Sequence, residues 1–228
     1  MKLLKSIVLV VTLFSAILFS SCDENNPLNP TGNARLKVIN SIATHGSVLL
    51  QFDSVTYNPT FGYTEATDYR SFTSGTHSVR VVGTSGSTTT EATLGRTLDA
   101  NTTHTWFVHD NINLNGFVYT TAVDNLNSPA SGKFKLRVAN VSPRTGAINI
   151  KSTGAPNDMF SNVSMSSVSG YLEFDEGTYS LEIRDASNGS LYGTPQTVTF
   201  TNGRIYDLAV SGLNTLGSPI IFTVYLSN

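Results

Sequence analysis

Four histidines are the residues of this chain that could most readily bind a metal ion: His45, His77, His104 and His109. Imidazole is a common zinc ligand, but a site needs three or four ligands that converge on one point. His104 and His109 are five positions apart, which places their side chains on opposite faces of an extended strand. The spacing favours separate roles, so we expect no metal and no cofactor.

Residues that could catalyse a reaction do not form a recognisable arrangement. The sequence has no Gly-x-Ser-x-Gly motif for a nucleophilic serine and no glycine-rich phosphate loop ahead of a helix. Asp175 and Glu176 are adjacent carboxylates, which on a turn are more typical of solvated charge than of a glycosidase pair. We therefore expect no catalytic residues. The alternative is an enzyme that acts on surface polysaccharide.

Aromatic side chains could instead stack on sugar rings. The single tryptophan, Trp106, aligns with Leu208 in the second half of the sequence, which favours a place in the core. Tyr57, Phe61, Tyr63 and Tyr192 fall in expected loops or at strand ends and are better candidates for a glycan-binding surface.

The N-terminus carries a signal and a lone cysteine. Lys2 and Lys5 precede the apolar run Ile7–Phe19, which is too short to cross a bilayer and has the length of a signal-peptide core. The following Leu18-Phe19-Ser20-Ser21-Cys22 resembles the lipobox of bacterial lipoproteins, with Phe19 bulkier than the usual residue. The resemblance implies a cleaved signal peptide over residues 1–21 and lipid on Cys22, and hence membrane attachment through that lipid.

Residues 22–33 are predicted to form a flexible tether, because this stretch is rich in asparagine and proline and has little apolar surface to bury. Asp23 and Glu24 follow the cysteine. In enteric bacteria an aspartate here resembles an inner-membrane retention signal. In another Gram-negative group, acidic residues here resemble an export signal to the cell surface. We expect an outer-membrane protein exposed at the surface, with a periplasm-facing position as the alternative.

Charge and cysteine content limit the partners and the means of stabilisation that the chain can have. Without the two signal lysines, 12 Lys and Arg stand against 16 Asp and Glu, which argues against a nucleic-acid partner. Cys22 is the only cysteine, so no disulfide can form within the chain and the folded part must be stabilised by its cores. The sequence does not indicate an oligomeric state.

Two halves of the sequence repeat each other. Leu36–Asn40 matches Leu136–Asn140, and a Tyr-x-x-Phe-x-x-Gly-Thr-x-Ser pattern occurs at 69–78 and again at 171–180. The alignment places His77 and His104 on Tyr179 and Tyr206, so these histidines are expected to pack in slots that the other repeat fills with an aromatic ring. The repeat predicts domains at 34–123 and 133–228, joined by a polar linker at 124–132.

Short segments of alternating apolar and polar residues, separated by turn signals, predict an all-β fold. We expect two tandem antiparallel β-sandwich domains of immunoglobulin-like type, with about seven strands each. The Leu-x-Val-x-Asn strand followed by the tyrosine–glycine pattern resembles the domain of unknown function 4397, a family of envelope lipoproteins and surface proteins. The resemblance implies fold and compartment and carries over no catalytic residue.

Asp53-Ser54-Val55 resembles the sequon for O-glycosylation of exported proteins in the same Gram-negative group, which makes Ser54 a candidate glycan acceptor. Together these features predict a non-catalytic, lipid-anchored envelope protein with two β-sandwich modules for binding, adhesion or envelope organisation. A glycan or an envelope protein is the expected partner. The alternative is a polysaccharide-acting enzyme or a glycan-binding accessory lipoprotein.

Overall fold

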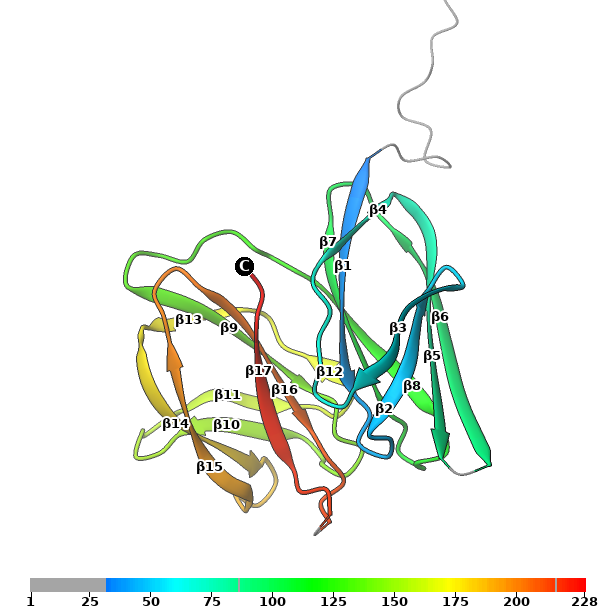
Figure 1. Ribbon diagram of the computed structural model, residues 1–228. Coiled ribbons are helices and arrows are strands. Elements are labelled where there is room, and N and C mark those ends of the chain that lie inside the picture. Colours follow the sequence, from blue (N-terminus) through cyan, green and yellow to red (C-terminus); the bar gives the residue numbers. More distant parts are fainter. Residues whose placement is uncertain (1–31, 86, 216) are drawn as a thin grey trace, which may run out of the picture.

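A computed structural model describes residues 32–85, 87–215 and 217–228 and shows an all-β protein (Figure 1). The predicted fold class is therefore confirmed. The predicted signal peptide and the lipid-attachment residue Cys22 lie outside the described residues. Within the described part of the chain, no helix is long and apolar enough to cross a membrane.

The N-terminal sandwich consists of two four-stranded sheets, ordered β4-β1-β7-β8 and β3-β2-β5-β6. Its strands are β1 (Asn33–Ser41), β2 (Ser47–Phe52), β3 (Val55–Gly62), β4 (Arg70–Thr73), β5 (Gly75–Ser85), β6 (Thr88–Leu98), β7 (Thr103–Asp110) and β8 (Phe117–Val123).

The C-terminal sandwich repeats this order, with sheets β12-β9-β16-β17 and β11-β10-β14-β15, and with β13 also pairing with β9. Its strands are β9 (Lys133–Asn140), β10 (Ile148–Ser152), β11 (Asp158–Val163), β12 (Ser167–Val168), β13 (Leu172–Asp175), β14 (Gly177–Asp185), β15 (Leu191–Phe200), β16 (Ile205–Ser211) and β17 (Ile221–Leu226).

One strand pair in each sandwich is parallel, which differs from the expected wholly antiparallel sheets. β1 pairs with β7 in parallel, with Leu36 opposite His104, and β9 pairs with β16 in parallel, with Leu136 opposite Tyr206. Strand β7 pairs with β1 only after β2, β3, β5 and β6 have formed the facing sheet, and this long connection permits a parallel neighbour. Apolar alternation identifies a strand but contains no information about its direction.

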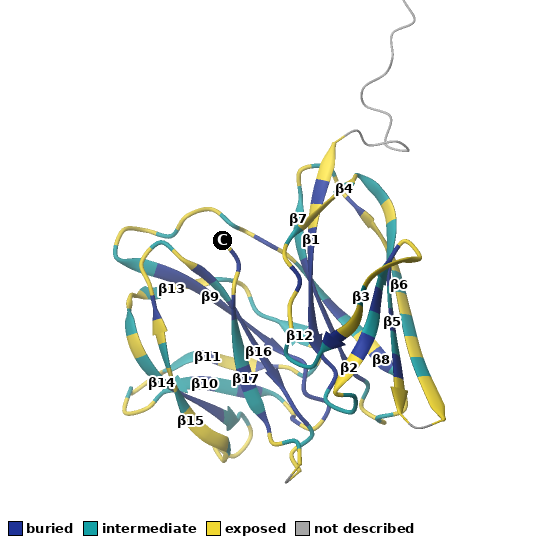
Figure 2. Cartoon of the chain, in the orientation of Figure 1, coloured by how far each residue is buried: buried dark blue, intermediate teal, exposed yellow. Residues whose placement is uncertain are grey.

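Each sandwich has its own apolar core between its two sheets (Figure 2). Trp106 is fully buried in the N-terminal core, as its sequence context predicted. The first strand of each sandwich also contains a fully buried asparagine. The Asn40 Nδ2 donates to the carbonyls of Phe61 and Gly62, and the Asn140 Nδ2 donates to the carbonyls of Gly146 and Val163. The asparagine of the Leu-x-Val-x-Asn motif thus connects the first strand of each sandwich to the end of a strand in the facing sheet, β3 or β11.

The glycine of the repeated tyrosine–glycine pattern marks where the chain changes sheets. Strand β4 belongs to the sheet of β1, whereas β5, which starts at Gly75, belongs to the facing sheet. Gly75 and its counterpart Gly177 adopt φ values of 136° and 153°. A side chain is disfavoured at such φ, so the crossing between sheets explains why both repeats place a glycine here.

Candidate functional site

The two sandwiches meet through the outer faces of the sheets that contain β1 and β9 (Figure 1). Apolar side chains from both sandwiches form a shared cluster whose buried members are Ile39, Phe107, Ala139, Val141, Ala209 and Tyr225. Strands β1, β7, β9 and β16 are therefore buried on both faces over most of their length. The interface is an additional core, built from positions that a lone sandwich would expose to water.

A buried ion network lies beside this cluster. Lys37 on β1 places its Nζ 2.8 Å from the Asp207 Oδ2 on β16, so this ion pair joins the two sandwiches. The same Nζ donates to the Ser227 Oγ at 2.7 Å. Arg137 on β9 bridges the carboxylates of Asp207 and Asp124. Two cations and two carboxylates thus neutralise one another inside the protein.

Two tyrosines from the repeated pattern complete the network. The Tyr69 hydroxyl donates to the Asp124 Oδ2 at 2.6 Å, and the Tyr171 hydroxyl donates to the Asp207 Oδ1 at 2.9 Å. Lys37 also lies 5.0 Å from the centre of the Tyr69 ring, and the Arg137 guanidinium lies 4.6 Å from that of Tyr171. Each sandwich therefore contributes one cation and one tyrosine from equivalent positions of the repeat.

The surroundings of Asp207 and the two tyrosines determine the protonation states of these groups. Burial alone would raise the pKa of Asp207, but the adjacent Arg137 and Lys37 outweigh burial and lower that pKa to about 2. Burial and the neighbouring carboxylates raise the pKa of Tyr69 and Tyr171, which keeps both hydroxyls protonated as donors. Because Asp207 stays ionised and both tyrosines stay protonated near neutral pH, the arrangement is suited to holding the sandwiches together.

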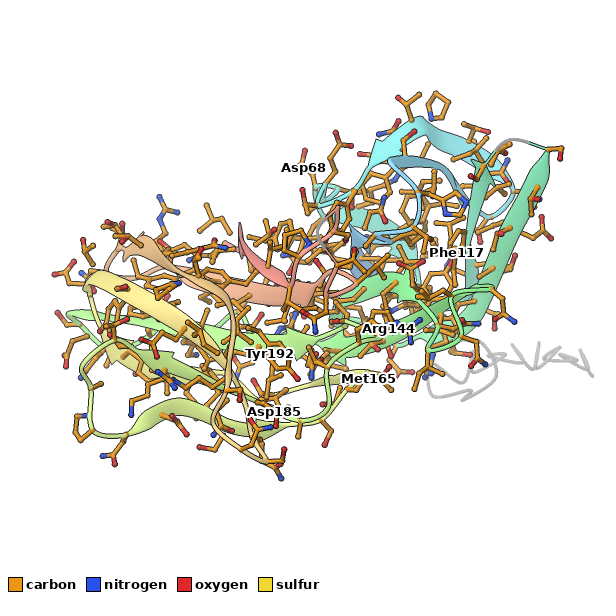
Figure 3. All side chains as sticks on the ribbon, turned by 90° about the horizontal axis from the view of Figure 1, so that it is seen from below. Asp68, Phe117, Arg144, Met165, Asp185 and Tyr192 are labelled. Atoms are coloured by element: carbon orange, nitrogen blue, oxygen red, sulfur yellow. The ribbon has the colours of Figure 1, made fainter. Side chains whose placement is uncertain are left out.

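A cavity of about 580 Å³ opens next to the network at the junction of the sandwiches. Figure 3 shows Asp68, one of its lining residues, between the two halves. The lining residues are Arg35, Lys37, Thr67, Asp68, Tyr69, Leu126, Leu226, Ser227 and Asn228. Arg35 lies 4.9 Å from the Tyr69 ring centre and forms no ion pair within the described part of the chain. The cavity thus offers a free guanidinium, a carboxylate and apolar walls.

In the structure, each of the four histidines has its own contacts, and none of the hydrogen bonds or ring contacts among the described residues joins two histidines. His77 lies 2.7 Å from the Asp53 carboxylate through its Nδ1 and 2.7 Å from the Thr73 carbonyl through its Nε2. Its counterpart Tyr179 donates to the equivalent carbonyl, that of Asp175, at 2.5 Å. Over residues 32–85, 87–215 and 217–228, no three His, Cys, Asp or Glu side chains are grouped as metal ligands would be.

The remaining histidines each have separate contacts. His109 is buried between the Asp110 carbonyl and the Thr120 hydroxyl, each 2.9 Å away, and burial lowers its pKa. His104 contacts the Thr102 hydroxyl at 2.8 Å, and burial lowers its pKa as well. His45 packs edge-on against Phe117.

The predicted surface aromatics do not form a row. The expectation for Phe61 was wrong: it is 1% exposed and belongs to the N-terminal core, because β3 turns its side chain toward the sandwich interior. Tyr63 bonds to Ser211 across the interface at 2.9 Å, and Tyr192 donates to Asp185 at 2.8 Å (Figure 3). Tyr57 is exposed at 38%.

Ser54 lies at the exposed tip of the β2–β3 hairpin. Asp53 and Ser54 have φ values of 46° and 68°, which is the conformation of a two-residue type I′ turn. The adjacent carboxylates Asp175 and Glu176 have separate partners: Asp175 pairs with Lys133, and Glu176 accepts from the backbone N–H of Asn202.

Sequence reasoning missed the ion network, although a signal was present. Lys37, Arg137 and Asp207 each lie on the outward side of their strand, two positions before an apolar residue of the shared cluster: Ile39, Ala139 and Ala209 respectively. Charges of opposite sign beside apolar residues on outward strand faces are consistent with a covered face in which the charges are paired.

Comparisons with known proteins show one family match. The family model described as "Domain of unknown function (DUF4397)" matches residues 34–151, from β1 into β10. No curated protein matches the sequence. Among solved structures, the C-terminal domain of AlgF from P. aeruginosa is similar, with 23% identity and a TM-score of 0.32 over 42% of this chain and 99% of that one.

Proposed function

Because this chain belongs to the DUF4397 family, whose model covers more than half of it, we propose that it is a non-catalytic, lipid-anchored envelope protein that presents two joined β-sandwiches for binding. The observation that carries the proposal is the Lys37–Asp207 ion pair, which is buried and connects the sandwiches. A buried, fully paired connection fixes the relative position of two modules, which is useful for presenting one composite surface.

The anchor in this proposal is Cys22. Lipid on its sulfur and N-terminus supplies two or more acyl chains, which give durable membrane attachment where a single chain would be marginal. The polar tether that follows would hold β1, which begins at Asn33, away from the bilayer. We place the folded part on the outer surface of the outer membrane.

Protease treatment of intact cells tests this proposal. Cells that express the wild type and a Cys22→Ala variant are treated, fractionated and probed for the folded domains. We expect the wild type to remain with the membrane and to be digested from outside, and the variant to lose membrane attachment. A membrane-bound wild type that resists protease would overturn surface display, and an unchanged Cys22→Ala variant would overturn the lipid anchor.

A second candidate function is glycan binding as an accessory to polysaccharide metabolism. The observation that favours it is the cavity of about 580 Å³ at the junction, since ligand sites often form between domains. Its free Arg35 guanidinium and Asp68 carboxylate could bond sugar hydroxyl or acid groups. Binding on a glycan array that disappears in Arg35→Ala would favour this function.

Ser54 is the proposed acceptor of an O-linked glycan. Its exposed place at a hairpin tip leaves room for a glycan without disturbing the sheet. Mass spectrometry of native material should show a heavier peptide containing Ser54, and the shift should disappear in Ser54→Ala. An unshifted wild-type peptide would exclude the modification.

A further inference from the structure

The edge of β8 is an open strand edge. β8 is the last strand of its sheet, and it pairs only with β7 among the described strands. The backbone N–H of Asp124 donates to the Thr103 carbonyl, so Asp124 is a hydrogen-bonded position of the β7–β8 pair. In an antiparallel pair such positions alternate along the strand, so every second residue before Asp124 also bonds to β7 through its backbone. The backbone groups of the residues between them, Tyr119 and Thr121 among these, therefore face away from β7.

A groove runs along this edge. Two hollows of about 630 and 150 Å³ share Arg96, Thr121 and Ala122 in their linings, so they lie next to each other. β6, the end strand of the facing sheet, contacts β8 on one side, and β12 of the C-terminal sandwich contacts it on the other. An extended chain laid along β8 would thus be flanked by both sandwiches.

Two unused hydrogen-bond donors border the smaller hollow. Trp106 lines it and is 0% exposed, and none of the described residues accepts a hydrogen bond from its indole Nε1–H. A buried donor without a partner is costly, so an acceptor supplied from outside would be favoured. Arg96 is exposed and forms no ion pair among the described residues. Both groups donate hydrogen bonds and neither can accept one, which selects for an oxygen-bearing ligand.

The charge of the groove also points to an acidic ligand. The described residues that line the two hollows include no aspartate or glutamate, although the chain as a whole is negatively charged. Arg96 is a cation shared by both hollows. A carboxylate placed there could accept from the guanidinium and from the indole N–H together.

We propose that the β8 edge is a docking site for an extended acidic peptide segment of a partner protein. The peptide adds as a new strand to β8, using the outward backbone groups of Tyr119 and Thr121. One of its carboxylate side chains enters the smaller hollow and bonds Arg96 and the Trp106 Nε1–H. The inference rests on the proposed binding function and names a partner class for it.

The test uses the fluorescence of Trp106, which is the only tryptophan and therefore reports on the hollow directly. The full mature chain in mild detergent is titrated with a capped peptide of alternating valine and glutamate, and separately with its valine–glutamine counterpart. We expect saturable changes in emission with the acidic peptide and at least tenfold weaker binding of the glutamine peptide.

Three variants identify the site. Arg96→Glu should weaken the acidic peptide at least tenfold. Thr121→Pro should abolish binding because it removes an outward N–H and leaves the bonds between β7 and β8 intact. Arg35→Glu, the same charge reversal at the cavity between the sandwiches, should bind like wild type. If Thr121→Pro does not fold, as judged by circular dichroism, Arg96→Glu decides alone.

Equal binding of the two peptides, or unchanged binding by Arg96→Glu, would overturn the proposal. Sedimentation provides a further outcome: a dimer that Thr121→Pro dissociates would show that a second copy of the chain occupies the edge instead. Failure here leaves membrane attachment and surface exposure untouched, so it is distinguishable from failure of the proposed function.

Discussion

Lys37→Met is the substitution that tests the connection between the sandwiches most directly. Methionine retains an apolar chain of similar length and removes the ammonium group that lies 2.8 Å from the Asp207 Oδ2. Asp207 would keep Arg137 as its only cationic partner, and Ser227 would lose the donor to its hydroxyl. The Asp207 carboxylate would remain buried but would lose one of the two positive charges that offset the cost of its burial.

The expected cost follows from the geometry. At 2.8 Å and an effective dielectric constant of about 20, the attraction between the charges is about 6 kcal/mol. The desolvation of Lys37 offsets several kcal/mol of this attraction, and the variant no longer bears that desolvation cost. Removal of one partner from a buried pair typically costs 3–5 kcal/mol, and the remaining Arg137 places Lys37→Met near the lower limit, about 3 kcal/mol.

Denaturant unfolding of residues 23–228, which retain every described residue, measures this loss. The matched control is Lys133→Met, since Lys133 pairs with Asp175 at 2.7 Å, but the Lys133 side chain is 37% exposed and that of Asp175 is 81% exposed. We expect no measurable change in the control because water screens exposed pairs. The difference in free energy of unfolding between the wild type and Lys37→Met should also become smaller as pH falls from about 4 to about 2, where Asp207 becomes protonated. A loss for Lys37→Met no larger than that of the control would refute the reasoning.

Three other predictions concern the same framework. The pKa of Asp207 is lowered from about 3.9 in the unfolded chain to about 2 in the fold, so its contribution of about 2 kcal/mol is present above pH 4 and is lost as pH falls toward 2. The free energy of unfolding, measured across this pH range, should depend less steeply on pH in Asp207→Asn than in the wild type, and an equal dependence would contradict the prediction. Gly75→Ala should lower the free energy of unfolding by at least about 1 kcal/mol through its positive φ, whereas Gly146→Ala, which has open space and no positive φ, should not. His77→Tyr should unfold within about 1 kcal/mol of wild type, because Tyr179 makes the same carbonyl bond in the other repeat; a larger loss would show that the two slots are not equivalent.

Local patterns in the sequence were sufficient to predict the all-β fold and much of the strand positions. Alternation of apolar residues is a property of a single strand, and it identified segments such as 103–108 and 205–210, which lie in β7 and β16. The repeated tyrosine–glycine pattern was also informative, since the glycine position corresponds to a backbone conformation that side chains disfavour.

The site was not predictable in the same way, because its contacts join residues far apart in the chain. Lys37 and Asp207 are 170 positions apart. The parallel pairing of β1 with β7 depends on the route of the chain between them, which apolar alternation does not encode. Phe61 was misjudged for a related reason: its position near a strand end indicated exposure, whereas the facing sheet covers it.

The repeat also explains why the interface is nearly, but not fully, symmetric. The cation and tyrosine occur in both sandwiches, but the carboxylate does not: Asp207 in β16 corresponds to Thr105 in β7. Asp124, the first residue of the predicted linker, takes the missing place, with its carboxylate accepting from Thr105 and Tyr69. Since Asp124 is 8% exposed and pairs with Arg137, the start of the linker is part of the interface. The connection between the sandwiches therefore depends on a residue that neither repeat contains, and two such repeats without this linker would lack one of the two carboxylates that balance Lys37 and Arg137.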